Sequence, residues 1–303
     1  MTLEKWVKKW LVTYKMIMVK PSTYDSYLHY AKHVNCDIEL SELTVFDIQE
    51  LISNMVSEGL KLSTIKHMLT LVRQALRKAR SLGMIDNLSM LEELELPRRS
   101  ACKVEALRAA EIEKIEMNRD MSFYGDFFLA LLYTGCRVGE LIALRWGDVN
   151  MFNREIHIQN TDYHGKLQEV KTENGVRTIP LYGELYLIFR KRYRARSSER
   201  VFTNTLGLPV KYRSVLDSWK LFTDKLGIAS CGFHKLRHTF AHNALRAGIP
   251  VKVVSAWLGH ADIYITLQIY DSVAPDDFWN AAEILQKKTT PHEERCKNNF
   301  LVV

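Results

Sequence analysis

The segment 231–271 constrains this chain most, because it gathers the residue types that bind and attack a phosphate. It holds His234 and Arg237 three positions apart, then His260 after a Leu-Gly pair, and Tyr270 ten positions further on. Residues at i and i+3 lie on one face of a helix, so the first two side chains can point at one ligand. His234 also stands near an expected helix start, where free backbone N–H groups favour an anion. We therefore predict a phosphate site with a tyrosine beside it.

The histidine spacing also raises the question of a metal site. His234, His238 and His242 recur at i, i+4 and i+8, and histidines at i and i+4 can offer a helix-borne pair of ligands to zinc. The metalloprotease pattern needs a glutamate directly after the first histidine, but Lys235 stands there, and Arg237 on the same face repels a divalent ion. We therefore expect no metal, and we interpret His238 and His242 as hydrogen-bonded packing residues.

Length and composition narrow the class of protein. A chain of 303 residues exceeds the usual size of one domain, which favours two. Lys and Arg number 42 against 35 Asp and Glu, a net charge of +7 that favours a polyanionic partner. There is no secretory signal pattern and no apolar run of membrane-spanning length, and the five cysteines form no C-x-x-C pair. These features predict a cytoplasmic protein with reduced thiols and no membrane partner.

Residues 1–97 are expected to form a helical domain that ends at a linker near Pro97. Ser22, Thr44 and Ser63 stand where caps of three helices belong, and Asp47 follows Thr44 at the capping-box spacing. The inner side of the second helix is predicted to carry Val45, Ile48, Ile52 and Val56. The apolar stripe of the third is Ile65, Leu69, Val72, Leu76 and Ala79, and its other side carries Lys66, Arg73, Arg77 and Arg80. This basic stripe is either a solvated face or a DNA contact.

The second domain is predicted to begin with helices at 110–117 and 123–133. The second of these stops at Gly135, and Arg137 starts another helix directly afterwards. An arginine at such a junction is well placed to bind phosphate oxygens, because a guanidinium can donate two parallel hydrogen bonds. Glu140 lies three residues on and can orient it.

The pattern between Arg154 and Pro180 changes to alternating apolar and polar residues, which predicts a small antiparallel sheet. We expect its last two strands, 167–171 and 176–179, to form a hairpin around the turn 173–175. Lys171 then lies at a strand end beside the turn, where it either reaches into a cleft or stays solvated. Helices are expected from residue 184 onward, including one at 277–286, and residues 289–303 are expected to form a flexible tail.

Five pieces of the second domain now stand in one order. They are Thr134-Gly135-Cys136-Arg137-Val138-Gly139-Glu140-Leu141, Val170-Lys171-Thr172 with Arg177-Thr178-Ile179-Pro180, His234-Lys235-Leu236-Arg237-His238-Thr239, Leu258-Gly259-His260, and Thr266-Leu267-Gln268-Ile269-Tyr270. In order and spacing they resemble the tyrosine recombinase (phage integrase) family, in the compact layout of its Xer-type enzymes. The resemblance implies a fold that is mainly α with a small antiparallel β-sheet. It divides into a helical core-binding domain at 1–97 and an α+β catalytic domain at 104–288.

The family resemblance gives three residues the task of holding the scissile phosphate. Arg137 and Arg237 would bind its two non-bridging oxygens and stabilise the charge of the pentavalent transition state, the role that a metal plays elsewhere. His260 would hydrogen-bond the same group. No metal and no nucleotide cofactor is implied.

The other three residues would move protons and form the covalent bond. A tyrosine phenol with a pKa near ~10 is a poor nucleophile until its proton is taken. Tyr270 would attack the phosphorus with assistance from His234, and Lys171 would protonate the departing 5′ oxygen. The resulting 3′-phosphotyrosyl ester keeps the energy of the broken bond, so religation needs no ATP.

The resemblance also names partners and leaves two alternatives. It implies double-stranded DNA, a homotetramer on two DNA sites with the helix after Pro275 packed on a neighbour, accessory DNA-bending or directionality proteins, and a nucleoid-associated location. A type IB topoisomerase uses the same chemistry. A DNA-binding regulator that kept the fold and lost catalysis is the other alternative, although a regulator has no need of Tyr270.

Overall fold

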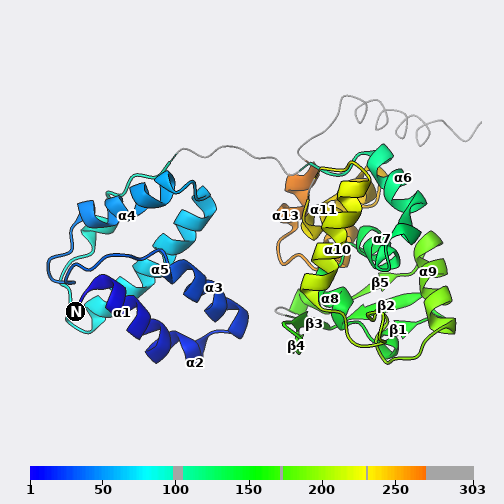
Figure 1. The fold of residues 1–303 in the computed structure, drawn as a ribbon, viewed down its shortest axis with the longest axis horizontal. Helices are drawn as coiled ribbons and strands as arrows, with labels where there is room; N and C mark the ends of the chain where they lie inside the picture. The colour runs from blue at the N-terminus through cyan, green and yellow to red at the C-terminus, as the bar shows by residue number, and fades with distance from the viewer. Residues whose placement is uncertain (98–104, 171–172, 230, 271–303) are drawn as a thin grey trace, which may run out of the picture. The chain divides into compact units, whose positions relative to one another are not determined.

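The computed structural model describes residues 1–97, 105–170, 173–229 and 231–270, and the chain divides into two units, Met1–Cys102 and Lys103–Val303 (Figure 1). The described part is mostly helical with a little antiparallel sheet, which confirms the predicted fold class. Across these ranges, every helix is too short or too polar to cross a lipid bilayer.

The first unit is a helical bundle built around its longest helix. Its elements are α1 (Leu3–Trp10), a π-helical turn (Leu11–Lys15), α2 (Met16–Met18), α3 (Pro21–Ala31), α4 (Val45–Ser57), α5 (Leu62–Ser81) and a 3-10 turn (Ser89–Leu91). The five predicted apolar stripe residues of α5 are all buried, because their spacing keeps them on one side of the helix. The indole Nε1 of Trp6 donates to the backbone oxygen of Ala75 at 2.8 Å and so joins α1 to α5.

The helix starts of this unit agree with the sequence prediction in one case of three. The Asp47 carboxylate accepts from both the backbone N–H and the hydroxyl of Thr44, each at 2.7 Å, so the predicted cap of α4 is confirmed. Ser22 and Ser63 are not caps, because α3 already begins at Pro21 and α5 at Leu62. Proline suits the first helical position, since its fixed φ is already helical and its missing N–H needs no partner.

The inner face of α4 also differs from the prediction. Its buried residues are Ile48, Leu51, Ile52 and Met55, whereas Val56 is 44% exposed and Val45 is half-buried. Adjacent residues point about 100° apart around a helix. The buried face of α4 therefore includes Met55 and excludes its neighbour Val56.

The second unit surrounds one almost wholly apolar helix. Its helices are α6 (Ala109–Met117), α7 (Gly125–Thr134), α8 (Val138–Ala143), α9 (Gly183–Arg194), α10 (Tyr212–Lys225), α11 (Phe233–Arg246), α12 (Val251–Leu258) and α13 (Ile263–Tyr270), with 3-10 turns at Arg119–Met121, Trp146–Asp148 and Glu173–Gly175. Helix α7 is buried on nearly all sides and packs against α9 and α11. Phe128 of α7 contacts Trp219 of α10 edge-to-face, with ring centres 4.9 Å apart.

The strands form two small sheets. β1 (Val149–Asn150), β2 (Glu155–Ile158) and β5 (Arg177–Pro180) make an antiparallel sheet in the order β1-β2-β5, and β3 (Asn160–Tyr163) pairs with β4 (Lys166–Glu169). The predicted hairpin between 167–171 and 176–179 is wrong, because β5 pairs with β2 and the hairpin joins β3 to β4. His164 and Gly165 have positive φ angles of 52° and 80°, the geometry that a two-residue hairpin turn requires.

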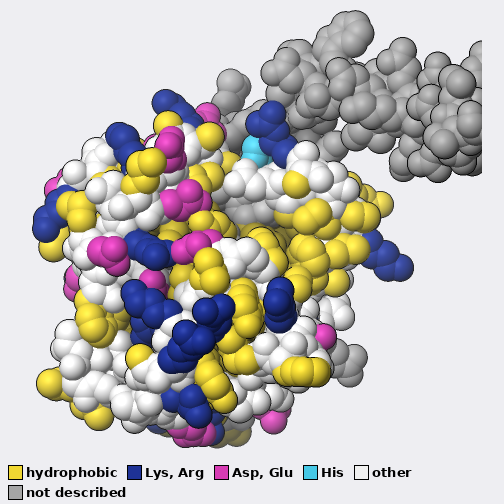
Figure 2. Space-filling model, turned by 90° about the vertical axis from the view of Figure 1, so that its right-hand side faces the viewer, with side chains coloured by type: hydrophobic (Ala, Val, Ile, Leu, Met, Phe, Trp, Pro, Cys, Tyr) yellow, Lys and Arg dark blue, Asp and Glu magenta, His cyan; other side chains and the backbone are white. Residues whose placement is uncertain are grey.

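Basic side chains gather on the α9 side of this unit, where Figure 2 shows a group of Lys and Arg residues. Helix α9 contributes exposed Arg190, Lys191 and Arg194. Arg192 is turned inward instead. Its Nη1 lies 3.4 Å from Asp126, its Nε donates to a backbone oxygen at 3.2 Å, and its guanidinium stacks on a buried phenyl ring.

Candidate active site

Arg137 stands at the N-terminus of α8 and is held there by Glu140. The preceding helix ends at Gly135, whose left-handed conformation (φ 63°) lets the chain restart at once as α8. One Glu140 oxygen accepts the backbone N–H of Arg137 at 2.8 Å, and the other accepts its Nη1 at 2.9 Å. The Arg137 side chain stays 51% exposed, so part of its guanidinium remains accessible to a ligand. The prediction that Glu140 orients Arg137 is confirmed.

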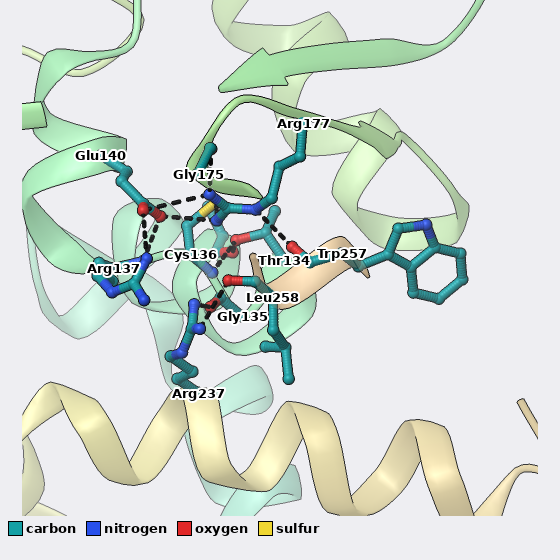
Figure 3. Close-up of polar contacts among 11 residues, drawn as sticks. Thr134, Gly135, Cys136, Arg137, Glu140, Gly175, Arg177, Arg237, Trp257 and Leu258 are labelled. Carbon is teal, nitrogen blue, oxygen red and sulfur yellow. Dashed lines mark hydrogen bonds and ion pairs between the residues drawn. The ribbon is translucent and has the colours of Figure 1, made fainter. Parts of the chain in front are cut away.

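A second arginine, Arg177 at the start of β5, binds the same carboxylate from inside the protein (Figure 3). Its Nη2 and Nη1 donate to the two Glu140 oxygens at 2.7 and 3.2 Å. Both partners are buried, with side-chain exposures of 5% and 2%. Burial by itself would raise the pKa of Glu140. The hydrogen bond and charge of Arg177, and to a smaller extent those of Arg137, outweigh burial and hold this pKa below its ordinary value.

Arg237 lies on α11 and binds the carboxyl ends of two other helices. Its Nη1 donates to the oxygen of Gly135, at the end of α7, at 2.8 Å, and its Nη2 donates to the oxygen of Leu258, the last residue of α12, at 2.6 Å (Figure 3). A cation is favoured at both places, because unpaired carbonyls and the helix dipole make helix C-termini negative. Burial and the nearby positive charge of Arg137 lower the pKa of Arg237 to about 10, which leaves it charged at neutral pH.

The two predicted histidines lie at helix ends in the same region. His260 follows Gly259, whose left-handed conformation (φ 66°) ends α12, and its Nδ1 lies 2.8 Å from the buried hydroxyl of Thr266 on α13. Burial, then the charges of Arg237 and Arg137, lower the pKa of His260 to about 4. His234 is the second residue of α11, and although its side chain is exposed, partial desolvation followed by the same two arginines lowers its pKa as well. Both imidazoles are therefore neutral at neutral pH.

The hydrogen bonds of Arg237 place it against the turn before Arg137 and against Leu258, two residues before His260, and His234 lies three residues before Arg237 on α11. Four of the six predicted catalytic residues therefore lie in one region. A pocket of about 430 Å³ opens beside His260, and its wall includes Arg177 and Gly259. Two arginines and two neutral imidazoles at one place supply positive charge together with hydrogen-bonding groups. That set suits a phosphodiester whose charge increases in the transition state.

The remaining two predicted residues are described in part or not at all. Lys171 lies outside the described residues, as does the helix expected at 277–286. Tyr270 is the last residue of α13. Thr266 lies four residues earlier on the same helix, so positions 266 and 270 share one side of α13.

The other histidines of α11 differ from one another. His242 Nδ1 lies 3.4 Å from the side-chain oxygen of Asn243, in agreement with hydrogen-bonded packing. For His238 that interpretation is wrong, because its buried Nδ1 lacks a hydrogen-bond partner in the described part of the chain. Its electrostatic neighbours along the helix are His234 and His242, and burial is the main cause of its lowered pKa. Within the same part of the chain, no three His, Cys, Asp or Glu side chains converge as a metal site.

The predicted basic stripe of α5 belongs to the first unit. Lys66, Arg77 and Arg80 are exposed there, whereas Arg73 is half-buried and its Nη2 donates to the backbone oxygen of Leu91 at 3.2 Å. Three of the four cations are thus accessible to a partner, and the fourth also has a packing contact.

The sequence pattern by itself assigns no role to two residues of the site. Arg177 belongs to the motif around β5, and Thr266 belongs to the motif that ends at the tyrosine. The signal for Arg177 was a charged residue within an alternating apolar strand, where an inward-pointing charge needs a buried partner. Thr266 carried a weaker signal, four residues before the tyrosine.

Comparisons with known protein families agree with this site. Residues 104–276 match the Phage integrase family, and residues 2–56 match the Phage integrase N-terminal SAM-like domain. The first match covers more than half of the chain, and it includes every residue of the site. The chain therefore belongs to the phage integrase family of tyrosine recombinases.

Individual relatives fit the same assignment. A "Tyrosine recombinase XerC-like" protein of Caldanaerobacter subterraneus subsp. tengcongensis is 26% identical over 322 aligned positions, which cover 94% of this chain and 82% of the relative. The Tn1549 transposon integrase, solved in complex with transposon right end DNA, superposes with a TM-score of 0.80 at 21% identity over 94% of this chain and 100% of that one. A lambda integrase tetramer bound to a Holliday junction gives 0.71 at 19% identity over 86% and 78%. At these identities the two structures show a shared fold.

Proposed function

We propose that this chain cuts and rejoins DNA at a specific site through a 3′-phosphotyrosyl intermediate on Tyr270. The observation that carries the proposal is the convergence of Arg137 and Arg237 with His234 and His260, beside the helix that ends at the tyrosine. Arg237 is fixed by two carbonyls, whereas Arg137 is half-exposed and uses one Nη on Glu140. A fixed cation and an accessible one can together hold a phosphate.

The chemistry balances within the active site. The phenolic oxygen of Tyr270 attacks the phosphorus, the bond to the 5′ oxygen breaks, and that oxygen leaves with a proton from Lys171. A neutral His234 can accept the phenolic proton, since desolvation and then the nearby arginines lower its pKa and disfavour its charged form at rest. His260 hydrogen-bonds the phosphate, and its link to Thr266 fixes the imidazole relative to α13. A 5′ hydroxyl then reverses the reaction on the new strand.

The same proposal covers domains, partners and location. Residues 1–97 act as the core-binding domain and 104–288 as the catalytic domain, whereas the tail expected at 289–303 lies outside the described residues. Double-stranded DNA is the substrate, and a homotetramer assembles on two sites with the helix after Pro275 on a neighbouring subunit. The matched integrase–DNA complexes and the lambda tetramer support these assignments by analogy. Accessory DNA-bending or directionality proteins and a cytoplasmic, nucleoid-associated location follow from the same analogy.

The test is to trap the covalent intermediate. The wild-type chain and Tyr270→Phe are incubated with sheared genomic DNA, quenched in denaturant and separated on a denaturing gel. We expect a DNA-linked protein band from the wild type alone, with equal non-covalent DNA binding by both. The absence of any adduct from the wild type would favour a DNA-binding regulator. An adduct that relaxes supercoils without exchanging strands between two sites would favour a type IB topoisomerase.

A further inference from the structure

Arg177 connects three segments that carry proposed catalytic residues. Through Glu140 it reaches the helix start that bears Arg137. Its Nη1 also donates at 3.0 Å to the backbone oxygen of Gly175, four residues after Lys171. Its Nε donates at 2.6 Å to the backbone oxygen of Trp257, three residues before His260. A single buried side chain thus holds Glu140, the backbone of Gly175 and the backbone of Trp257 together (Figure 3).

The packing around Arg177 leaves little freedom for it to move. A Cβ added to Gly259 would lie 3.2 Å from Cδ of Arg177 and 2.8 Å from the backbone oxygen of Asn174, so the turn before His260 presses directly on the arginine and its loop. Gly139 of α8 approaches β3 just as closely, since an added Cβ would lie 2.6 Å from the Thr161 hydroxyl. The helix of Arg137 and the hairpin are therefore packed as one body.

The shared carboxylate gives Arg177 a second effect, on charge. Glu140 is nearly fully buried and ionised, and Arg177 neutralises it from the protein interior. Arg137 therefore needs only one Nη to complete the pairing, and its other donors stay available. Without Arg177, Arg137 would be the only partner that the described residues offer to this buried carboxylate. A guanidinium pairs with a carboxylate most strongly through two parallel hydrogen bonds, so Arg137 would turn away from the ligand and onto Glu140.

We propose that Arg177 is a positioning residue for the cleavage reaction, which keeps Arg137 free to bind the scissile phosphate by neutralising Glu140 from behind. The inference rests on the proposed function, because it assigns Arg137 to phosphate. It makes a specific prediction: the loss of DNA binding and cleavage in Arg177→Met must be caused by the charge of Glu140. Removing that charge as well must therefore restore Arg137.

The experiment compares Arg177→Met, Glu140→Gln and the double variant with the wild type in two measurements. The first is the salt dependence of DNA binding, which needs no catalysis. In Arg177→Met, Arg137 no longer neutralises a phosphate. The magnitude of the slope of log K against log salt should therefore decrease by roughly one unit, and the double variant should regain the wild-type slope. The second is the single-turnover cleavage rate per folded molecule. We expect a decrease of about 10²-fold for Arg177→Met, as for removal of an oxyanion donor, and at least about tenfold recovery in the double variant.

Arg192→Met is the matched control for the loss of a partly buried, paired arginine. Arg192 also pairs with a carboxylate and a backbone oxygen, and it lies on α9, a helix that carries none of the proposed catalytic residues. It should lower the melting temperature and leave both the salt slope and the cleavage rate unchanged. If Arg177→Met does not fold, the double variant still decides, because removing both charges of a buried pair is tolerated better than removing one. The salt slope and the cleavage rate of the double variant must then be larger than those of Arg137→Ala.

Two results would overturn the inference. One is an Arg177→Met protein that keeps the wild-type slope and rate once folded. The other is a double variant no better than Arg177→Met in either measurement, which would leave the arginine a structural role only. A wild type that forms no adduct would instead contradict the proposed function, and the salt-slope comparison would still test the effect of Arg177 on Arg137.

Discussion

The guanidinium of Arg237 donates a 2.8 Å hydrogen bond to the carbonyl oxygen of Gly135, a residue 102 positions away in the sequence. Gly135 ends α7 and stands two residues before Arg137, so this bond ties the two proposed phosphate-binding arginines to one backbone turn. Their separation is therefore set by the fold before any DNA binds. Such preorganised donors stabilise a transition state without the cost of reorganisation.

We expect Arg137→Ala and Arg237→Ala each to slow cleavage by roughly 10²–10³-fold, by analogy with the loss of one oxyanion donor. Arg237→Lys should not restore the rate, because an ammonium cannot reproduce the planar fork that reaches both Gly135 and Leu258. Single-turnover cleavage at saturating protein measures this directly. A lysine variant at the wild-type rate would mean that charge alone matters at this position.

The left-handed turn at Gly135 is expected to tolerate no side chain. In Gly135→Ala, the Cβ would lie 2.5 Å from the Phe240 ring and 2.8 Å from Leu258, and the left-handed conformation itself costs about 1–2 kcal/mol. Crowding adds about 1–3 kcal/mol. Gly227→Ala is the matched control, since its φ is also left-handed (64°) while nothing lies within 4 Å of an added Cβ. Denaturant titration should find a clearly larger loss of unfolding free energy for Gly135→Ala, together with slower cleavage.

The proposed role of Lys171 as the general acid can be isolated by changing the leaving group. A 5′-bridging sulfur leaves without a proton, because a thiol is far more acidic than an alcohol. Lys171→Ala should be severely slowed on ordinary DNA and largely restored on this phosphorothiolate substrate, whereas Arg237→Ala should gain much less. Equal defects of Lys171→Ala on both substrates would make the lysine a phosphate-binding or structural residue, with His234 the next acid to test.

The basic stripe of α5 should contribute to DNA affinity through its exposed cations. Replacing Lys66 and Arg80 with Gln should flatten the log–log salt dependence of binding by roughly two units, one for each phosphate that is no longer neutralised. Lys5 and Lys8 serve as controls, because each already pairs with a carboxylate on the surface of the same unit. Their replacement should leave the slope unchanged. An unchanged slope for the stripe variant as well would identify the stripe as a solvated face.

The lowered pKa of His260 predicts a loss of stability in mild acid. An unfolded histidine takes up a proton below its ordinary pKa of 6.5, whereas the folded one stays neutral down to about 4. The unfolded state therefore binds more protons in this window, and the unfolding free energy falls as the pH drops from 6.5 towards about 4. His260→Asn should flatten that decline without abolishing it, because His234 and His238 shift in the same direction. Urea titrations at pH values on both sides of the window provide the test.

The sequence alone determined those features of this protein that depend on neighbours along the chain. Local hydrogen bonds account for the turns at Gly135 and Gly259 and for the capping box of Thr44 with Asp47. Helical spacing accounts for the buried stripe of α5. The pairing of Glu140 with Arg137 is of the same kind, since three residues on a helix start bring them together. The motifs that carry the family assignment are short for the same reason.

Tertiary structure decided the rest, because a strand or a buried charge can choose among many distant partners. β4 pairs with β3 and leaves β5 to β2, although the sequence pattern favoured a β4–β5 hairpin. Arg177 meets Glu140 across 37 residues of sequence, and only the folded core brings that arginine, the carboxylate and the Trp257 carbonyl together. Desolvation makes such a contact essential once the charges are buried, yet nothing in the local sequence reveals which partner will satisfy them.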